Sequence, residues 1–262
     1  MSEPAQCVTW APGRVNLIGE HTDYSGGLVL PVAIQFGISV TASPDDGRVT
    51  LRSDQFGAAE PFASEGAGRQ VGGWGRYAQA VASELAELGR PPVGLSGTIA
   101  SDLPSGAGLS SSAALEVAVG LALCAVAGFE LAPLELALAC QRAELRAVGV
   151  PCGILDQAAS LLAEEGHALL LDCGTLEHRL VPVPEDAALV VIDSGVEHSH
   201  ETSGYAQRRR ELEAGVPSRV RHVRTENERV RLAGKCRRPI MQDPCFRLRS
   251  SFMVFAPMRR LP

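Results

Sequence analysis

Four side chains that can bind a hydroxyl-rich small molecule lie close together near the start of the chain: Arg14, Glu20, His21 and Asp23. The apolar runs 15–18 and 28–34 on either side are typical of strands, and Gly19 with the glycine-rich stretch 25–27 predicts a turn between them. A turn that presents two carboxylates and an imidazole offers hydrogen-bonding groups that suit the hydroxyls of a sugar. A solvated polar turn is the alternative interpretation of the same residues.

A second candidate is the Gly/Ser-rich stretch 105–112, which lies between a predicted strand over 94–101 and a predicted helix over 111–127. Glycines let a ligand approach the backbone closely, and the N-terminus of a helix carries roughly half a positive charge, which favours phosphate. The serine hydroxyls add oxygen ligands of the kind that Mg²⁺ binds. The stretch therefore predicts a phosphate site, with a linker or a plain helix cap as the alternative. It matches neither a Walker A loop nor a dinucleotide-binding fingerprint.

A third candidate is Asp156, which follows Gly153 at the start of a predicted helix over 154–162. A carboxylate at the N-terminus of a helix is often only a capping group, and the local sequence alone favours that role. Glu144 lies on the preceding predicted helix, over 134–148. A solvent-exposed helical glutamate is the alternative to a functional role for Glu144.

Taken in order, these segments resemble the motifs of the GHMP kinases, the family named for galactokinase, homoserine kinase, mevalonate kinase and phosphomevalonate kinase. The segment 11–24 resembles the galactokinase signature, 102–116 resembles the phosphate-binding motif, and 151–157 resembles the segment that carries the catalytic aspartate. The resemblance extends from about residue 10 to about residue 210, and a short echo follows at 220–229.

The resemblance implies roles for individual residues. Asp156 is the base that takes the proton from the sugar hydroxyl, and Arg14 beside it keeps that carboxylate ionised and stabilises the transferring phosphoryl group. Ser112 and Glu144 hold Mg²⁺. The arginine run 208–210 is expected on a solvated helix face. The residues implied in sugar binding are Glu20, His21, Asp23, Gly153 and Tyr205. The residues implied in binding the phosphates of ATP are Ser105, Gly106, Ala107, Gly108, Leu109, Ser110, Ser111 and Ser112.

The family also implies an activity, the ATP-dependent phosphorylation of α-D-galactose at O1. ATP and Mg²⁺ are the expected cofactors, and galactose and MgATP the expected partners, with no nucleic acid, no membrane and a monomeric protein. Three alternatives remain open: a catalytically inactive relative that binds sugar and ATP, a truncated remnant, and a kinase for a related sugar such as galacturonate or N-acetylgalactosamine. The segment 20–23 favours plain galactose.

Composition is consistent with this interpretation. The chain has 262 residues, 45% of them hydrophobic, and no apolar run of the roughly 18 residues that a membrane span needs. Its N-terminus lacks the basic and apolar regions of a secretory signal. The seven cysteines show no C-x-x-C pair, which suits a reducing compartment. We therefore expect a cytoplasmic protein.

Strands followed by helices and then by further strands predict an α+β fold. The resemblance implies the two-domain GHMP kinase fold. Its N-terminal domain, like the second domain of ribosomal protein S5, covers 1–184, and a truncated C-terminal domain leaves a remnant over 185–232. Strands are expected at 7–10, 14–18, 28–34, 36–42, 48–53, 94–101, 168–172, 178–183 and 189–193. Helices are expected at 74–88, 111–127, 134–148, 154–162 and 207–214, and a loop at 54–73.

The C-terminal part departs from the family. Residues 208–262 contain fourteen Arg and one Lys against five acidic residues, although the whole chain has a net charge of −6. This part shows no clear helical stripe and no nucleic-acid motif, so nucleic acid is not expected to bind. The likeness ends at 232, and the glycine-rich third motif is absent. We expect 233–262 to form a divergent, disordered basic tail, because it lacks the apolar periodicity needed to offset its conformational entropy.

Overall fold

The structure is a computed structural model, and it describes residues 6–104, 106–149, 151–184, 187–192, 205–235 and 253–257. The chain divides into two compact units. The first comprises Met1–Gly13, Ile34–Ser105 and Leu109–Leu162, and the second comprises Arg14–Ala33, Gly106–Gly108 and Ala163–Pro262. The expected domain division at 184 and 232 stays a prediction.

One layer of the first unit is a six-stranded sheet in the order β1-β3-β7-β4-β5, with β6 paired to β4. The strands are β1 (Cys7–Asn16), β3 (Pro31–Asp45), β4 (Arg48–Ser53), β5 (Gly57–Ala58), β6 (Phe62–Ala63) and β7 (Gly94–Ser101). Strand β7 runs antiparallel to β3 and parallel to β4. The short strands β5 and β6 lie in the stretch 54–73, where a loop was expected.

The expected strand 7–10 and the first three residues of the expected strand 14–18 form the single strand β1, which continues through Pro12 and Gly13 and ends at Asn16. Gly13 is required there by close packing. A Cβ at this position would lie 2.6 Å from Leu103 Cδ2 and 2.7 Å from the carbonyl oxygen of Leu109. Glycine inside a strand often marks such a close approach, and here it lets β1 pack against Leu103, just before the Gly/Ser-rich stretch, and against Leu109 within it.

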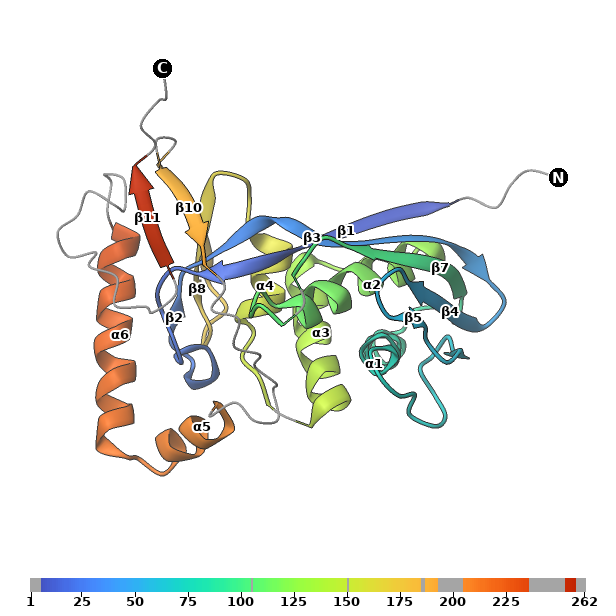
Figure 1. The fold of residues 1–262 in the computed structure, drawn as a ribbon. Helices are drawn as coiled ribbons and strands as arrows, with labels where there is room; N and C mark the ends of the chain where they lie inside the picture. The colour runs from blue at the N-terminus through green and yellow to red at the C-terminus, as the bar shows by residue number, and fades with distance from the viewer. Residues whose placement is uncertain are drawn as a thin grey trace, which may run out of the picture. The chain divides into compact units, whose positions relative to one another are not determined.

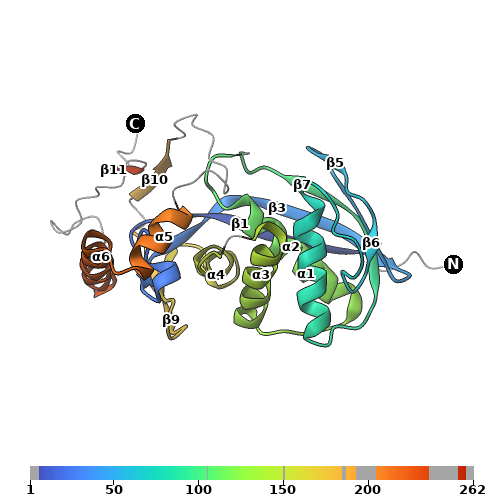
Figure 2. The same cartoon turned by 90° about the horizontal axis from the view of Figure 1, so that it is seen from below.

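Four helices cover one face of this sheet: α1 (Gly75–Glu87), α2 (Ser111–Ala127), α3 (Pro133–Val148) and α4 (Leu155–Leu162). They lie below the strands in Figure 1 and in front of them in the view from below in Figure 2. All four were predicted within one residue at each end. Helix α2 is buried on almost every side, and Thr9 of β1 donates a hydrogen bond of 2.8 Å to the carbonyl of Ala118 within it. The helix that follows the Gly/Ser-rich stretch is thus fixed to the sheet.

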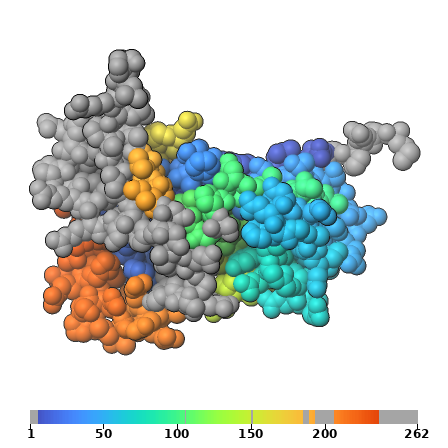
Figure 3. All heavy atoms as spheres, viewed as in Figure 1, coloured from blue at the N-terminus to red at the C-terminus, as the bar shows by residue number. Residues whose placement is uncertain are grey.

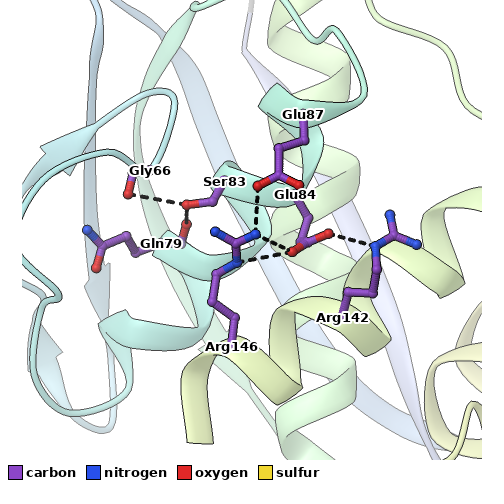
Figure 4. Close-up of polar contacts among 7 residues, drawn as sticks. All are labelled: Gly66, Gln79, Ser83, Glu84, Glu87, Arg142 and Arg146. Carbon is purple, nitrogen blue, oxygen red and sulfur yellow. Dashed lines mark hydrogen bonds and ion pairs between the residues drawn. The ribbon is translucent and has the colours of Figure 1, made fainter. Parts of the chain in front are cut away.

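A buried carboxylate joins α1 to α3 (Figure 4). Glu84 accepts hydrogen bonds from Arg142 Nε at 2.7 Å and from Arg146 Nη2 at 2.8 Å, and Arg146 also contacts Glu87 at 2.7 Å. A buried charge is tolerated when it is paired and hydrogen-bonded in this way. The network sets the position of α3, the helix that carries Glu144.

The second unit contains a three-stranded antiparallel sheet in the order β2-β8-β9. Its strands are β2 (Leu28–Val29), β8 (His167–Asp172) and β9 (His178–Pro182). A separate antiparallel pair joins β10 (Ala187–Val191) to β11 (Met253–Pro257). The unit also contains the 3₁₀ turn η1 (Asp23–Ser25) and the helices α5 (Tyr205–Glu213) and α6 (Pro217–Lys235). Its core is formed by Leu17, Leu28, Leu30, Ala168, Val181, Val230 and Ala233.

Helix α6 corrects the expectation that the basic part of the chain has no helical stripe. Its buried residues are spaced at i, i+4, i+7 and i+8, which is one face of a helix; they are Glu226, Val230, Ala233 and Gly234. The stripe was missed because it begins with a glutamate and is flanked by charged residues. Residues 233–235 belong to α6 and 253–257 to β11, whereas the rest of 233–262 lies outside the described residues, so a disordered tail stays a prediction.

Most arginines of α5 and α6 lie on the solvated faces of these two helices, which are orange at the lower left of Figure 3. The exposed ones are Arg208, Arg210, Arg221, Arg224, Arg229 and Arg231. Arg209 forms an ion pair with Glu213 at 2.9 Å, and Arg219 forms one with Glu211 at 2.7 Å. No helix of the described ranges is both long enough and apolar enough to cross a membrane.

Candidate active site

The Gly/Ser-rich stretch ends at the N-terminus of α2, as the sequence predicted. Gly106, Gly108 and Ser110 all have positive φ angles, of 74°, 70° and 59°. A Cβ built at either glycine would meet no atom within 4 Å, so the backbone there borders open space. Ser110 is the N-cap residue of α2, but its side chain does not cap the helix. The first N–H groups of α2 are therefore not capped by this hydroxyl, and the helix dipole favours an anion beside them.

The hydroxyl of Ser110 instead contacts Asp156. Ser110 Oγ donates a hydrogen bond of 2.6 Å to Oδ2 of Asp156, which lies in the first turn of α4. The two residues are separated by 46 positions in the sequence. Asp156, the candidate base, therefore lies in the first turn of its own helix α4 and also beside the N-terminal end of α2, where it contacts Ser110 of the candidate phosphate loop.

A buried polar network lies one turn further along α2. Ser112 Oγ donates to Oε1 of Glu144 at 2.9 Å. Gln157 Nε2 donates to Oε2 of Glu144 at 2.8 Å and to Oε2 of Glu116 at 3.0 Å. Glu144 is only 4% exposed, so the alternative of a solvent-exposed helical glutamate is wrong. The network joins α2, α3 and α4 at the point where the candidate metal ligands meet.

Glu116 and Gln157 are the residues of this network to which the sequence assigned no role. Both are fully buried. Burial, and then the charge of Glu144, raise the pKa of Glu116 well above its usual range. The sequence does contain a pattern that could have identified Glu116, because it is the single glutamate in an otherwise apolar helix. A carboxylate buried in such a helix needs a hydrogen-bonding partner.

The oxygen donors of Ser112 and Glu144 suit a hard cation. Mg²⁺ takes oxygen ligands and usually keeps several waters, so one hydroxyl and one carboxylate are a sufficient protein contribution when phosphates supply the rest. Within the described ranges, no group of three or more His, Cys, Asp or Glu side chains is arranged to hold a metal ion by itself.

In the second unit, the candidate sugar-binding residues lie on the segment 19–28, which we call the sugar loop. Thr22 at its centre is fully buried, and its Oγ1 lies 2.8 Å from the carbonyl of Gly19 and 2.7 Å from that of Leu28. The N–H of Gly27 donates to the carbonyl of Thr22 at 2.8 Å. These contacts close the loop from within, so Glu20, His21 and Asp23 are carried by a compact turn.

His21 has the most unusual environment in the sugar loop. Its φ angle is 62°, in the left-handed region that few non-glycine residues adopt. Burial, and then the charges of Arg208, His222 and Arg219, lower its pKa to about 4. The imidazole is therefore neutral at pH 7, with one donor and one acceptor nitrogen. Nε2 of His21 lies 3.4 Å from Nη1 of Arg208, so this member of the arginine run reaches the loop, which the sequence did not predict.

Three further candidates, Arg14, Glu20 and Gly153, also lie among the described residues. Arg14 Nη1 donates to the carbonyl of Gly108 at 3.0 Å, and Asn16 Nδ2 donates to Oε1 of Glu20 at 2.9 Å. Gly153 is buried just before α4. Arg14 belongs to the second unit and Asp156 to the first, so their expected pairing stays a prediction. Ser105 lies outside the described residues, as does the side chain of Tyr205, the first residue of α5.

Two protein families match the sequence. Residues 76–164 match the family described as GHMP kinases N terminal domain, and residues 1–44 match the galactokinase galactose-binding signature. The first match covers α1 through α4, and the second covers the sugar loop and the strands around it. The first match therefore contains the stretch 105–112, Glu144 and Asp156, and the second contains Arg14, Glu20, His21 and Asp23.

Curated relatives agree with these matches. The chain is 45% identical over 224 residues to a galactokinase of Chloroflexus aggregans, covering 85% of this chain and 56% of the relative. It is 46% identical over 215 residues to a galactokinase of Chloroflexus aurantiacus, covering 81% and 55%. The chain thus spans about half the length of the curated relatives it matches.

Solved structures give the same result. The fold superposes on Lactococcus lactis galactokinase complexed with galactose with a TM-score of 0.79 and 30% identity, covering 87% of this chain and 69% of that one. Methanococcus jannaschii mevalonate kinase matches with a TM-score of 0.67 and 17% identity, covering 90% and 75%, which is a likeness of fold alone. The expected α+β fold of this superfamily is confirmed.

Proposed function

Because the chain belongs to the galactokinase family of the GHMP kinases, we propose that it transfers the γ-phosphoryl group of ATP to O1 of α-D-galactose. The contact between Ser110 and Asp156 is the observation that carries the proposal. It holds a carboxylate at the N-terminus of the helix that follows the candidate phosphate loop. A carboxylate with only a capping function does not need a partner on a different helix.

The sugar loop provides the groups that bind the hydroxyls. Glu20 and Asp23 accept hydrogen bonds from sugar hydroxyls, and neutral His21 exchanges both kinds of hydrogen bond with them. Gly153 and Tyr205 complete the sugar contacts that the family resemblance assigns. Plain galactose is the proposed sugar. Galacturonate and N-acetylgalactosamine are the alternatives that the experiment below separates.

The residues 105–112 and the N-terminus of α2 bind the phosphates of ATP. The open space beside Gly106 and Gly108 admits the phosphate chain, and the helix dipole attracts its charge. Ser112 and Glu144 would hold Mg²⁺, which neutralises charge on the phosphate oxygens when it is bound. The buried network through Gln157 keeps the Glu144 carboxylate in place for this task.

In the transfer, Asp156 accepts the proton of the O1 hydroxyl as the oxygen attacks the γ-phosphorus. The bond from that phosphorus to the β,γ-bridging oxygen breaks, and ADP and galactose 1-phosphate result. Arg14 stabilises the negative charge that develops on the transferring group, which a guanidinium does better than an ammonium. Positioning and electrostatics supply most of the rate acceleration in phosphoryl transfer.

We further propose that the chain acts in the cytoplasm as a monomer, without nucleic-acid or membrane partners. The five cysteines in the part of the chain that the structure describes are free thiols, which suits a reducing compartment. Two arginines of α5 and α6, Arg209 and Arg219, form ion pairs with Glu213 and Glu211, so part of the positive charge of these helices is neutralised.

ADP release in a coupled assay tests the proposal. The purified chain is supplied with MgATP and one of three sugars: galactose, galacturonate or N-acetylgalactosamine. Turnover with galactose at least about tenfold above the other two supports the proposed function, since each 1.4 kcal/mol of discrimination is a factor of ten. Turnover with another sugar only would move the function to that substrate. Binding of galactose and MgATP without turnover would identify a non-catalytic relative.

A further inference from the structure

Helix α6 contacts the sugar loop at three successive points. Oε1 of Glu226 accepts a hydrogen bond from the N–H of Gly19 at 3.0 Å. Oδ1 of Asn227 accepts one from the N–H of Leu28 at 2.7 Å. Nε2 of His222 lies 2.8 Å from the carbonyl oxygen of Glu20. Because a carbonyl oxygen can only accept a hydrogen bond, Nε2 is the donor. One helix therefore holds both ends of the loop, Gly19 and Leu28, and also Glu20, which carries its first carboxylate.

The packing leaves the loop little freedom to move relative to α6. A Cβ at Gly19 would lie 2.6 Å from the carbonyl oxygen of Leu28, and a Cβ at Gly27 would lie 2.7 Å from Oδ1 of Asn227. The backbone of Gly19 also has a φ of 104°. Val230, one turn after Glu226, is fully buried in the core that also contains Leu17 and Leu28. Hydrogen bonds and apolar contacts thus act on the same segment.

Glu226 is itself held in place. Only 6% of the residue is exposed, and Arg229 on the next turn pairs with its second carboxylate oxygen. A buried carboxylate that accepts a backbone N–H and an arginine contributes a charge-assisted hydrogen bond, which is stronger than a neutral one. Its geometry is therefore set before any ligand arrives.

We propose that Glu226, Asn227 and His222 are positioning residues for sugar binding: they fix the sugar loop in the conformation that presents Glu20, His21 and Asp23. None of the three is assigned a sugar contact. The inference rests on the proposed function, because it takes the loop to be the sugar-binding element. It gives the segment 220–229 a function in substrate affinity rather than in structure alone.

The test measures two affinities of the full chain by calorimetry, one for galactose and one for MgATP. Asn227→Leu removes the acceptor for Leu28 and keeps a similar volume, whereas Asn227→Asp keeps an acceptor oxygen. We expect Asn227→Leu to weaken galactose binding about tenfold, because the partly buried N–H of Leu28 loses its acceptor, and to leave MgATP binding within about twofold. Asn227→Asp is expected to retain galactose binding within about threefold. Glu228→Leu, an exposed position on the same helix, is the matched control that changes neither affinity.

Each outcome is decisive. If the unaltered chain binds no galactose, the proposed function fails, and with it the premise of the inference. If the unaltered chain binds galactose and Asn227→Leu binds it equally well, the positioning role is wrong and the proposed function stands. If Asn227→Leu does not fold, the same two affinities are measured for His222→Ala, because His222 is only partly buried. Weaker galactose binding with unchanged MgATP binding supports the positioning role. The role is wrong if the affinities for galactose and MgATP fall equally, or if neither falls.

Discussion

Ser112 Oγ and Glu144 Oε1 lie 2.9 Å apart, one on α2 and the other on α3. The hydroxyl and the carboxylate meet in a buried network whose other members, Gln157 and Glu116, are fully enclosed. Two oxygen donors held together by packing are preorganised for a cation, because no side chain has to be ordered when the cation binds. This contact makes the proposed dependence on Mg²⁺ testable by mutation.

Glu144→Ala is therefore expected to raise the Mg²⁺ concentration needed for half-maximal turnover by at least about tenfold, since even outer-shell changes at metal sites have effects of this size. The measurement is initial rate against Mg²⁺ concentration at fixed ATP. Glu130→Ala, at an exposed glutamate, is the control that leaves the curve unchanged. An unchanged curve for Glu144→Ala would remove Glu144 from the metal site.

Gly108→Val is expected to weaken ATP binding by at least about tenfold, because its side chain would occupy the open space proposed for the phosphates and would strain a backbone with positive φ. Gly128→Val is the matched control. Gly128 also has a positive φ, of 60°, and also borders open space, but it follows the C-terminus of α2. Strain alone would affect both variants equally, so equal ATP affinity in the two would contradict a phosphate loop at 105–112.

Asp23→Ala is expected to cost about 1–3 kcal/mol of galactose binding, because a sugar hydroxyl would lose its acceptor in the bound state. Calorimetry with galactose measures this cost, and the affinity for MgATP serves as the internal control. Galactose affinity equal to that of the unaltered chain would show that Asp23 does not contact the sugar.

The environment of His21 predicts a pH dependence of stability. The folded chain holds the pKa of His21 at about 4, whereas an unfolded histidine titrates near 6.5. The unfolded state therefore binds a proton first as the pH falls, so the contribution of His21 is complete above pH 6.5 and is lost between pH 6.5 and 4. Melting temperatures across this range should fall less for His21→Asn than for the unaltered chain. Parallel curves for the two proteins would contradict a buried, neutral His21.

The parts of the fold that the sequence predicted are those with a regular apolar pattern. Helix α2 is apolar on nearly all sides and begins after a glycine- and serine-rich stretch, so both its type and its ends were evident. Helix α6 was missed because its buried face begins with Glu226 and its other faces are charged. The buried face of a helix is hard to recognise from the sequence when one of its positions is a hydrogen-bonded carboxylate instead of an apolar residue.

The candidate site was predictable only as a set of residues. The motifs around Ser110, Glu144 and Asp156 identified them, but no local pattern shows that Ser110 contacts Asp156 across 46 positions. Such contacts depend on how α2, α3 and α4 pack. The roles of Gln157 and Glu226 were likewise hidden, since each acts on a neighbour that is distant in the sequence.

The most direct test of the proposed activity is ³¹P NMR of a mixture of galactose, MgATP and the purified chain, compared with its Asp156→Asn variant. We expect a sugar-phosphate resonance assigned to galactose 1-phosphate to grow with the unaltered chain, and its rate to fall by about 10²–10⁴-fold with Asp156→Asn, the range for loss of a general base. Asp54→Asn, at an exposed aspartate, should retain the full rate. No galactose 1-phosphate from the unaltered chain, or an equal rate from Asp156→Asn, would contradict a galactokinase in which Asp156 is the base.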